Sequence, residues 1–226
     1  MEIRKNPLVN DHYYHIFNRS IAKFEIFSQN DDFSRIINIL NLYRYAEFNY
    51  KYSEFNDLSL NSQNNILADL KESESFLVKP VAYCIMPTHL HLLLKQVSDH
   101  GISKYMAKVL NGYSRYFNIK YQRIGPLWES RFKSVLVAAD EQLLHLTRYI
   151  HLNPTSAGLV KNPEDWEYSS YNQYINPQEK KSERFCEYSE LFDLSPKQYR
   201  DFVDDRKSYQ KEISIIKKAL IDDYLG

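Results

Sequence analysis

Apolar residues recur along the chain at two spacings, every second position in some segments and every third or fourth position in others. The first spacing is typical of strands and the second of amphipathic helices. Runs of β-branched, aromatic and leucine residues predict strands at 12–19, 78–86, 89–95 and 132–139. Helical spacing predicts helices at 31–48, 102–118 and 140–153, the last ending where Asn153 precedes Pro154.

These elements follow one another in the order strand, helix, strand, strand, helix, strand, helix. This order is typical of the ferredoxin-like split β-α-β arrangement. We therefore predict an α+β fold in which helices cover one face of an antiparallel sheet, with a helical tail at the C-terminal end.

Two segments do not fit this pattern of strands and helices. Residues 49–78 are polar, and we interpret them as an insertion that is irregular apart from a short helix near 66–71. Residues 173–226 carry dense mixed charge, and the Ser-Pro pair at 195–196 is typical of a helix start. The prediction is one domain over 8–172 that contains the insertion, followed by a charged helical extension.

Two histidines separated by one residue, His89 and His91, stand at the start of the strand predicted at 89–95. Because side chains alternate along a strand, both imidazoles project from one face, and the leucines between and after them pack on the other. Neutral imidazole is a common metal ligand, so this pair makes half of a metal site. An ordinary hairpin that happens to carry two histidines explains the pair equally well.

The helix predicted at 140–153 carries Tyr149 and Asn153 one turn apart, where both side chains can address one point. Two imidazoles and the amide oxygen of Asn153 would hold a divalent cation, and such mixed ligands suit Mg²⁺ or Mn²⁺ at least as well as Zn²⁺. A cation beside Tyr149 would make its phenol a nucleophile toward a phosphate. Without the histidines, this stripe is an ordinary polar helix edge.

Charge is balanced over the whole chain, with 29 Lys and Arg against 29 Asp and Glu, so any contact with a polyanion must be local. The clearest cationic stretch lies within 104–133, where aromatic residues are interleaved with the cations. A solvated helix flank is the alternative interpretation. The candidate residues for contact with nucleic acid are Arg19, Lys104, Lys108, Arg115, Lys120, Arg123, Trp128, Arg131 and Lys133.

Only two cysteines, Cys84 and Cys186, occur in the sequence. They form neither a metal-binding quartet nor a disulfide framework, which favours a reducing compartment. The first residues lack the apolar run of a secretory signal, and no later apolar run approaches membrane-spanning length. We expect a soluble cytoplasmic protein that does not associate with a membrane.

Several blocks of the sequence resemble the single-tyrosine transposases that move short insertion sequences as single-stranded DNA. Residues 86–93 resemble the HUH motif of that family, named for its two histidines. Further blocks resemble the branch associated with repetitive extragenic palindromes (REP), and they lie at 14–19, 125–134, 149–154, 157–160 and 166–171. The blocks keep the family's order from about residue 13 to residue 171.

This resemblance implies a site and a reaction. It implies His89, His91 and Asn153 as ligands of Mg²⁺ or Mn²⁺, and Tyr149 as the nucleophile that becomes joined to a DNA 5′ phosphate. The implied substrate is single-stranded DNA cleaved and rejoined beside a hairpin. The sequence departs from the family pattern at Thr88, where an Asn is expected, and in the long insertion. Both a monomer and a homodimer remain open.

Two other functions are compatible with parts of this pattern. A phosphoesterase of the two-histidine-motif class would need two H-x-[ST] elements, and the sequence contains only one, at 145–147. A noncatalytic, domesticated protein of the same fold that binds single-stranded nucleic acid is the stronger alternative. Retention of Tyr149 together with the three proposed ligands favours the enzyme.

Overall fold

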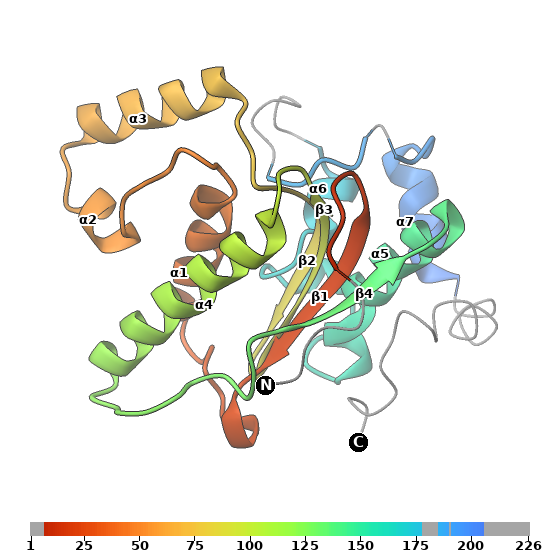
Figure 1. Ribbon diagram of the computed structural model, residues 1–226. Helices are drawn as coiled ribbons and strands as arrows, with labels where there is room; N and C mark the ends of the chain where they lie inside the picture. The colour runs from red at the N-terminus through yellow and green to blue at the C-terminus, as the bar shows by residue number, and fades with distance from the viewer. Residues whose placement is uncertain (1–6, 178–184, 190, 206–226) are drawn as a thin grey trace.

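The computed structural model describes residues 7–177, 185–189 and 191–205. Its centre is a four-stranded antiparallel sheet with the order β2-β3-β1-β4 (Figure 1). The strands are β1 (Tyr13–Arg19), β2 (Val78–Met86), β3 (His89–Gln96) and β4 (Lys133–Val137). This strand order and the helices between the strands confirm the predicted α+β class with a ferredoxin-like arrangement.

Helices α1 (Asn30–Tyr43) and α4 (Gly101–Lys120) pack together over one face of the sheet. The alternating leucines Leu90, Leu92 and Leu94 point into this core, each at most 1% exposed. The predicted alternation along β3 is therefore confirmed, since the positions between these leucines face the other way.

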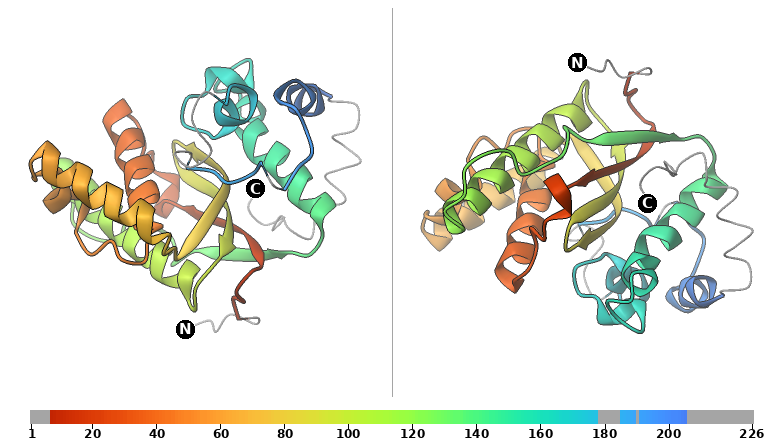
Figure 2. Two further views of the ribbon diagram at one scale, coloured as in Figure 1. Left: turned by 90° about the horizontal axis from the view of Figure 1, so that it is seen from above. Right: turned by 90° about the horizontal axis from the view of Figure 1, so that it is seen from below.

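The expectation that helices cover only one face needs a correction. Helix α5 (Asp140–Ser156) packs on the opposite face, where Leu146 and Ile150 meet Cys84 and Leu93 in a second core. Figure 2 shows the sheet between two groups of helices. The physical reason is that β2 and β3 are almost continuously apolar, so both of their faces must be buried.

Two helix ends also differ from the prediction. Helix α1 ends at Tyr43 because the next residues turn to pair with the chain before β2, through hydrogen bonds from Leu77 N to Arg44 O (2.8 Å) and from Ala46 N to Ser75 O (2.9 Å). Helix α5 runs through Pro154 to Ser156. Proline in the last turn removes one backbone donor, and the neighbouring helical bonds continue.

The insertion at 49–78 is more regular than predicted. It contains α2 (Tyr52–Asn56) and α3 (Leu60–Ser73), and the side chain of Ser59 caps α3 by accepting a hydrogen bond from Ser62 N (3.2 Å). Buried Phe55 and Leu70 attach this pair of helices to the core of α1 and α4. The segment therefore extends the domain at the side away from α5 (Figure 2).

The chain after α5 packs beside it. A short turn η2 (Pro163–Asp165) leads to α6 (Tyr171–Ile175), and α7 (Pro196–Asp204) begins at the predicted Ser195 cap. Tyr199 of α7 is buried against α5 and α6. Part of the predicted C-terminal extension, 206–226, lies outside the described residues. Among the helices of the described ranges, none has the length and apolar character needed to cross a bilayer.

Candidate active site

His89 and His91 lie on the face of β3 that is turned toward α5. Strand pairing places His89 opposite Arg19 of β1, and His91 opposite Phe17 of β1 and Cys84 of β2. The two imidazole rings are 5.0 Å apart between centroids. The two histidines therefore project from one face of the strand as neighbouring rings, as the H-x-H pattern predicts.

A third imidazole, that of His15 on β1, joins this pair. His15 Nε2 lies 3.0 Å from His91 Nδ1, and the two rings are stacked with centroids 5.2 Å apart. On the other histidine, His89 Nδ1 lies 2.9 Å from Thr88 Oγ1. Both Nδ1 atoms are thus engaged, which directs further binding by His89 and His91 to their Nε2 atoms.

Sequence reasoning missed His15, although it occurs in one of the blocks that carry the resemblance. Alternation along β1 assigns His15 to one face of a strand but does not say which strand lies beside it. The register between the two strands identifies it. His15 pairs with Leu93, so it is the diagonal neighbour of His91 on the same face of the sheet.

Burial keeps His89 and His91 neutral. It lowers the pKa of His89 to about 4, with a smaller contribution from the charge of Arg19. Burial also holds the pKa of His91 well below its usual value. Electrostatic repulsion between a protonated His91 and His89, His15 or Arg19 lowers it further. Neutral imidazole has the lone pair that a metal ion requires, so the pair is ready to act as ligands at physiological pH.

The ring of Tyr149, on α5, contacts the rings of two of these histidines. Its ring centroid is 5.8 Å from that of His91 and 6.1 Å from that of His15, both in edge-to-face orientation. The flanking residues Leu146 and Ile150 anchor α5 to the sheet and so fix this position. The predicted nucleophile and the predicted ligand pair therefore meet in space.

Asn153 follows one turn later on α5. Its side-chain Nδ2 donates to the carbonyl oxygen of Tyr149 over 2.8 Å, which leaves Oδ1 as the atom with acceptor capacity. Within the described residues, no group of three or more His, Cys, Asp and Glu side chains is arranged to hold a metal ion. A cation at His89 and His91 would therefore need an oxygen ligand of another kind, and the amide of Asn153 is of that kind.

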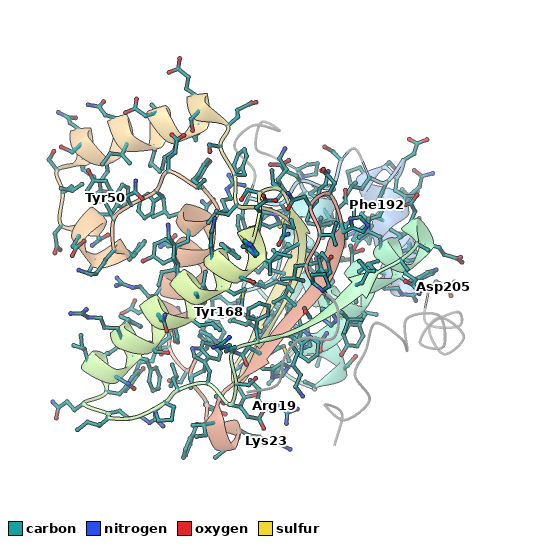
Figure 3. The ribbon with its side chains drawn as sticks, in the orientation of Figure 1. Arg19, Lys23, Tyr50, Tyr168, Phe192 and Asp205 are labelled. Atoms are coloured by element: carbon teal, nitrogen blue, oxygen red, sulfur yellow. The ribbon has the colours of Figure 1, made fainter. Side chains whose placement is uncertain are left out.

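Two of the predicted DNA-contacting cations lie on the same face as the histidines. Arg19 pairs with His89 in the sheet, and Lys133 of β4 pairs with Phe17, which pairs in turn with His91. Arg131 is exposed just before β4. Figure 3 shows Arg19 at the lower end of the sheet, next to Lys23.

The predicted cations of α4 lie on the other side of the sheet, because α4 packs against the leucine face of β3. Lys104 and Arg115 are exposed there. Lys108 donates to Phe48 O over 3.1 Å, and Lys120 forms an ion pair with buried Asp32 over 2.8 Å. These two lysines have structural partners, which the sequence pattern did not reveal.

Trp128 is a core residue and is not placed for stacking on a base. Only 9% of it is exposed, and its indole Nε1 donates to Leu110 O over 3.2 Å. The bridge between Ser20 and Trp128 explains the burial, because it ties this loop to the end of β1. Arg123, in the same loop, donates to Pro126 O over 2.9 Å.

His151, between Tyr149 and Asn153, faces away from the histidine cluster and has a structural environment. Its Nδ1 lies 2.8 Å from Tyr199 Oη and its Nε2 lies 2.7 Å from Ser170 Oγ, and burial lowers its pKa to about 3. Ser170 Oγ also accepts from Tyr83 N of β2 over 2.9 Å. The block at 166–171 therefore fixes α5 against the outer strand of the sheet.

A family model described as "Transposase IS200 like" matches residues 8–153, which include both histidines, Tyr149 and Asn153. The chain belongs to the IS200-like transposase family. The match ends at Asn153, so the family region holds β1 to β4 and most of α5.

Two curated relatives are REP-associated tyrosine transposases by name. One, from Haemophilus influenzae, is 30% identical over 113 residues, 45% of this chain and 64% of the relative. The other, from Escherichia coli, is 22% identical over 95 residues, 42% of this chain and 54% of the relative. The matched part of this transposase thus spans less than two thirds of the length of each.

The fold also matches that of a solved REP-associated tyrosine transposase bound to a REP hairpin. The TM-score is 0.55 at 13% sequence identity, with 87% of this chain and 96% of that chain covered. At this level of identity, the match shows that the two transposases share a fold.

Proposed function

We propose that this transposase cleaves and rejoins single-stranded DNA beside a hairpin, through a covalent bond between Tyr149 and a DNA 5′ phosphate. The observation that carries the proposal is the edge-to-face approach of Tyr149 on α5 to His91 on β3, with ring centroids 5.8 Å apart. The REP hairpin bound to the structural relative supports a hairpin as substrate. Such an enzyme would act in the cytoplasm, at the nucleoid.

The chemistry of the donor set fits a divalent cation. His89 and His91 would bind it through Nε2, since their Nδ1 atoms are engaged, and Asn153 would bind it through Oδ1, since its Nδ2 is engaged. Bound there, Mg²⁺ or Mn²⁺ would polarise a phosphate and lower the free-energy cost of the phenolate form of Tyr149.

In the proposed reaction, two cationic residues would bind the DNA and Tyr149 would attack it. Arg19 and Lys133, on the face of the histidines, would bind phosphates on either side of the reacting bond. Tyr149 Oη would lose its proton and bond to phosphorus, while the bond from phosphorus to the 3′ oxygen of the preceding nucleotide breaks. Because one phosphodiester replaces another, the freed 3′ hydroxyl can reverse the step without ATP.

An adduct assay tests this proposal. A hairpin oligonucleotide taken from the DNA beside the gene is mixed with the protein and Mg²⁺ or Mn²⁺, and the products are separated on a denaturing gel. We expect a label at the 3′ end to run with the protein, and a label at the 5′ end to be released. Chelation of the metal should remove the adduct. Tight binding of the hairpin with no adduct would instead indicate a noncatalytic DNA-binding protein.

His15 has a testable role in this site as a positioning residue. For His91 Nε2 to keep its lone pair, His91 Nδ1 must carry the proton and donate it to His15 Nε2, 3.0 Å away. Replacing His15 with phenylalanine keeps a ring but removes the acceptor, and is expected to weaken Mn²⁺ binding by about 10- to 100-fold. Electron paramagnetic resonance of free Mn²⁺ measures this affinity.

Two further variants test whether the loss of Mn²⁺ binding is due to the missing hydrogen-bond acceptor at position 15. Glutamine at position 15 offers an amide oxygen and should restore part of the affinity. The same His-to-Phe change at exposed His12 should leave Mn²⁺ binding unchanged. Equal affinity in wild type and His15→Phe would exclude the positioning role.

A further inference from the structure

Two loops meet at the end of the sheet where the histidine strand begins. The first contains η1 (Ile21–Lys23) and wraps the turn before His89, with hydrogen bonds from Ser20 N to Thr88 O (2.8 Å) and from Ile26 N to Pro87 O (2.9 Å). The second, 121–131, is tied to it by a bond from Ile21 N to Leu127 O (2.9 Å). Both loops are therefore built onto the edge of the candidate active site.

The first loop holds an aromatic ring outward at a conformational cost. Ala22 and Lys23 have left-handed backbones, with φ of 53° and 56°, which residues with side chains rarely adopt. Ser20 Oγ holds this conformation by donating to Phe24 O over 2.6 Å. The result is that 57% of Phe24 remains exposed beside Lys23, whose side chain lies at the lower tip of the molecule (Figure 3).

The second loop brings a cation and an aliphatic side chain to the same place. The guanidinium of Arg123 lies 6.0 Å from the centre of the Phe24 ring. The next residue, Ile124, is 97% exposed, at a turn completed by Gly125 with φ of 105°. We call Lys23, Phe24, Arg123 and Ile124 the basal surface.

We propose that the basal surface binds unpaired bases of the DNA strand that enters the active site. This inference rests on the proposed function, which supplies DNA as the ligand. An exposed phenyl ring beside a guanidinium offers a base one stacking face and one cationic partner, a combination that suits single-stranded nucleic acid.

Charge and position favour this occupant. The segments 19–28 and 121–131 together carry four cationic and two acidic side chains, so the rim around Phe24 attracts phosphates. Arg19, at the start of the first loop, pairs directly with His89. A strand bound at the basal surface would therefore lead toward the histidines and Tyr149. A base inside a duplex is already stacked on both sides, so the hairpin stem would not engage Phe24.

A fluorescence experiment tests the stacking directly. Phe24→Trp places an indole at the basal surface, and Leu60→Trp, at a side chain that is 76% exposed on α3, is the matched control. A hairpin with unpaired tails is expected to quench the fluorescence of Phe24→Trp and to leave that of Leu60→Trp unchanged. A blunt hairpin should quench neither. Equal quenching by blunt and tailed hairpins, or none by either, would overturn the proposal.

Affinity gives a second readout. Loss of one base stack is expected to weaken binding of the tailed hairpin by about 5- to 150-fold in Phe24→Ala, with no change for the blunt hairpin. Leu60→Ala should bind both as wild type does. Unchanged affinity of Phe24→Ala for the tailed hairpin would contradict the proposal.

The adduct assay separates this inference from the proposed function. If wild type forms the adduct but the fluorescence of Phe24→Trp is not quenched, the basal surface does not bind bases, and the proposed cleavage reaction is unaffected. If Phe24→Trp is quenched by tails but wild type forms no adduct, the surface binds single strands and the proposed cleavage is wrong.

Discussion

Tyr149→Phe is expected to abolish the covalent protein–DNA adduct while leaving the affinity for the hairpin within about twofold, because it removes one oxygen that acts in the reaction and not in binding. The ring remains, so its edge-to-face contacts with His91 and His15 are preserved. A denaturing gel measures the adduct, and fluorescence anisotropy measures the affinity.

The matched control makes the same chemical change at a neighbouring tyrosine. Tyr13 lies on β1 and packs into the core on the same face of the sheet. Tyr13→Phe should form the adduct at the wild-type rate. If Tyr149→Phe also forms it at that rate, another residue is the nucleophile.

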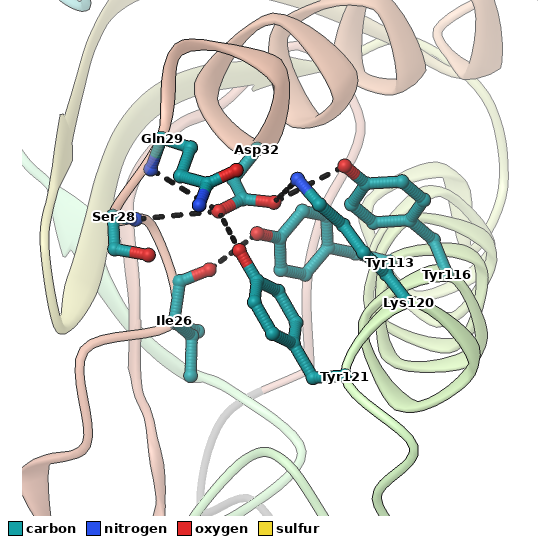
Figure 4. A network of polar contacts seen from close by, with 8 residues as sticks. All are labelled: Ile26, Ser28, Gln29, Asp32, Tyr113, Tyr116, Lys120 and Tyr121. Atoms are coloured by element: carbon teal, nitrogen blue, oxygen red, sulfur yellow. Dashed lines mark hydrogen bonds and ion pairs between the residues drawn. The ribbon is translucent and has the colours of Figure 1, made fainter.

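Asp32→Asn is expected to cause the largest loss of stability, about 3–5 kcal/mol in the free energy of unfolding. The carboxylate of Asp32 is completely buried and accepts hydrogen bonds from Lys120 (2.8 Å), Tyr121 (2.7 Å) and Tyr116 (3.1 Å) (Figure 4). It also accepts from the backbone N of Gln29 over 3.2 Å. An amide in its place leaves the ammonium group of Lys120 without a counter-charge.

The pH dependence of this loss has a defined sign. Burial alone would raise the pKa of Asp32, but the hydrogen bonds from Lys120, Tyr121 and Tyr116 outweigh it and hold the pKa below its usual value. The stabilisation is therefore present above the ordinary carboxyl pKa of about 4 and is lost as the pH falls below it. Urea unfolding at pH 7 should show the full difference between wild type and Asp32→Asn, and the difference should shrink below about pH 4.

Asp31 provides the control for this variant. It is exposed in the first turn of α1, beside Asp32. Asp31→Asn removes only a favourable interaction with the helix dipole and should cost less than about 1 kcal/mol. Similar losses in the two variants would show that the network in Figure 4 does not hold the ends of α1 and α4 together.

Local patterns in the sequence were sufficient for much of the fold and for part of the site. Alternation along β3 placed the leucines and the two histidines on opposite faces, and helical spacing placed Tyr149 and Asn153 one turn apart. Each of these inferences uses residues close together in the sequence, where the backbone geometry alone fixes which side chains are neighbours.

Contacts between distant segments could not be predicted in this way. The approach of His15 to His91 depends on the register between β1 and β3, and the burial of Trp128 depends on a bridge to Ser20. The partner of Lys120 is Asp32, which lies on another helix. The sequence shows that these residues are polar or aromatic. Only the tertiary packing shows which cations have partners in the fold and which lie on the face of the candidate active site.

The most direct test of the central claim is to identify the residue that carries the DNA. The adduct is digested with nuclease and then with trypsin, and the peptide that retains the nucleotide is sequenced by mass spectrometry. Trypsin cleaves after Arg148 and Lys161, and the peptide 149–161 contains a single tyrosine, Tyr149. We predict that this peptide carries a nucleotide, joined through its 5′ phosphate to Tyr149. A nucleotide on any other peptide would contradict the account of this site.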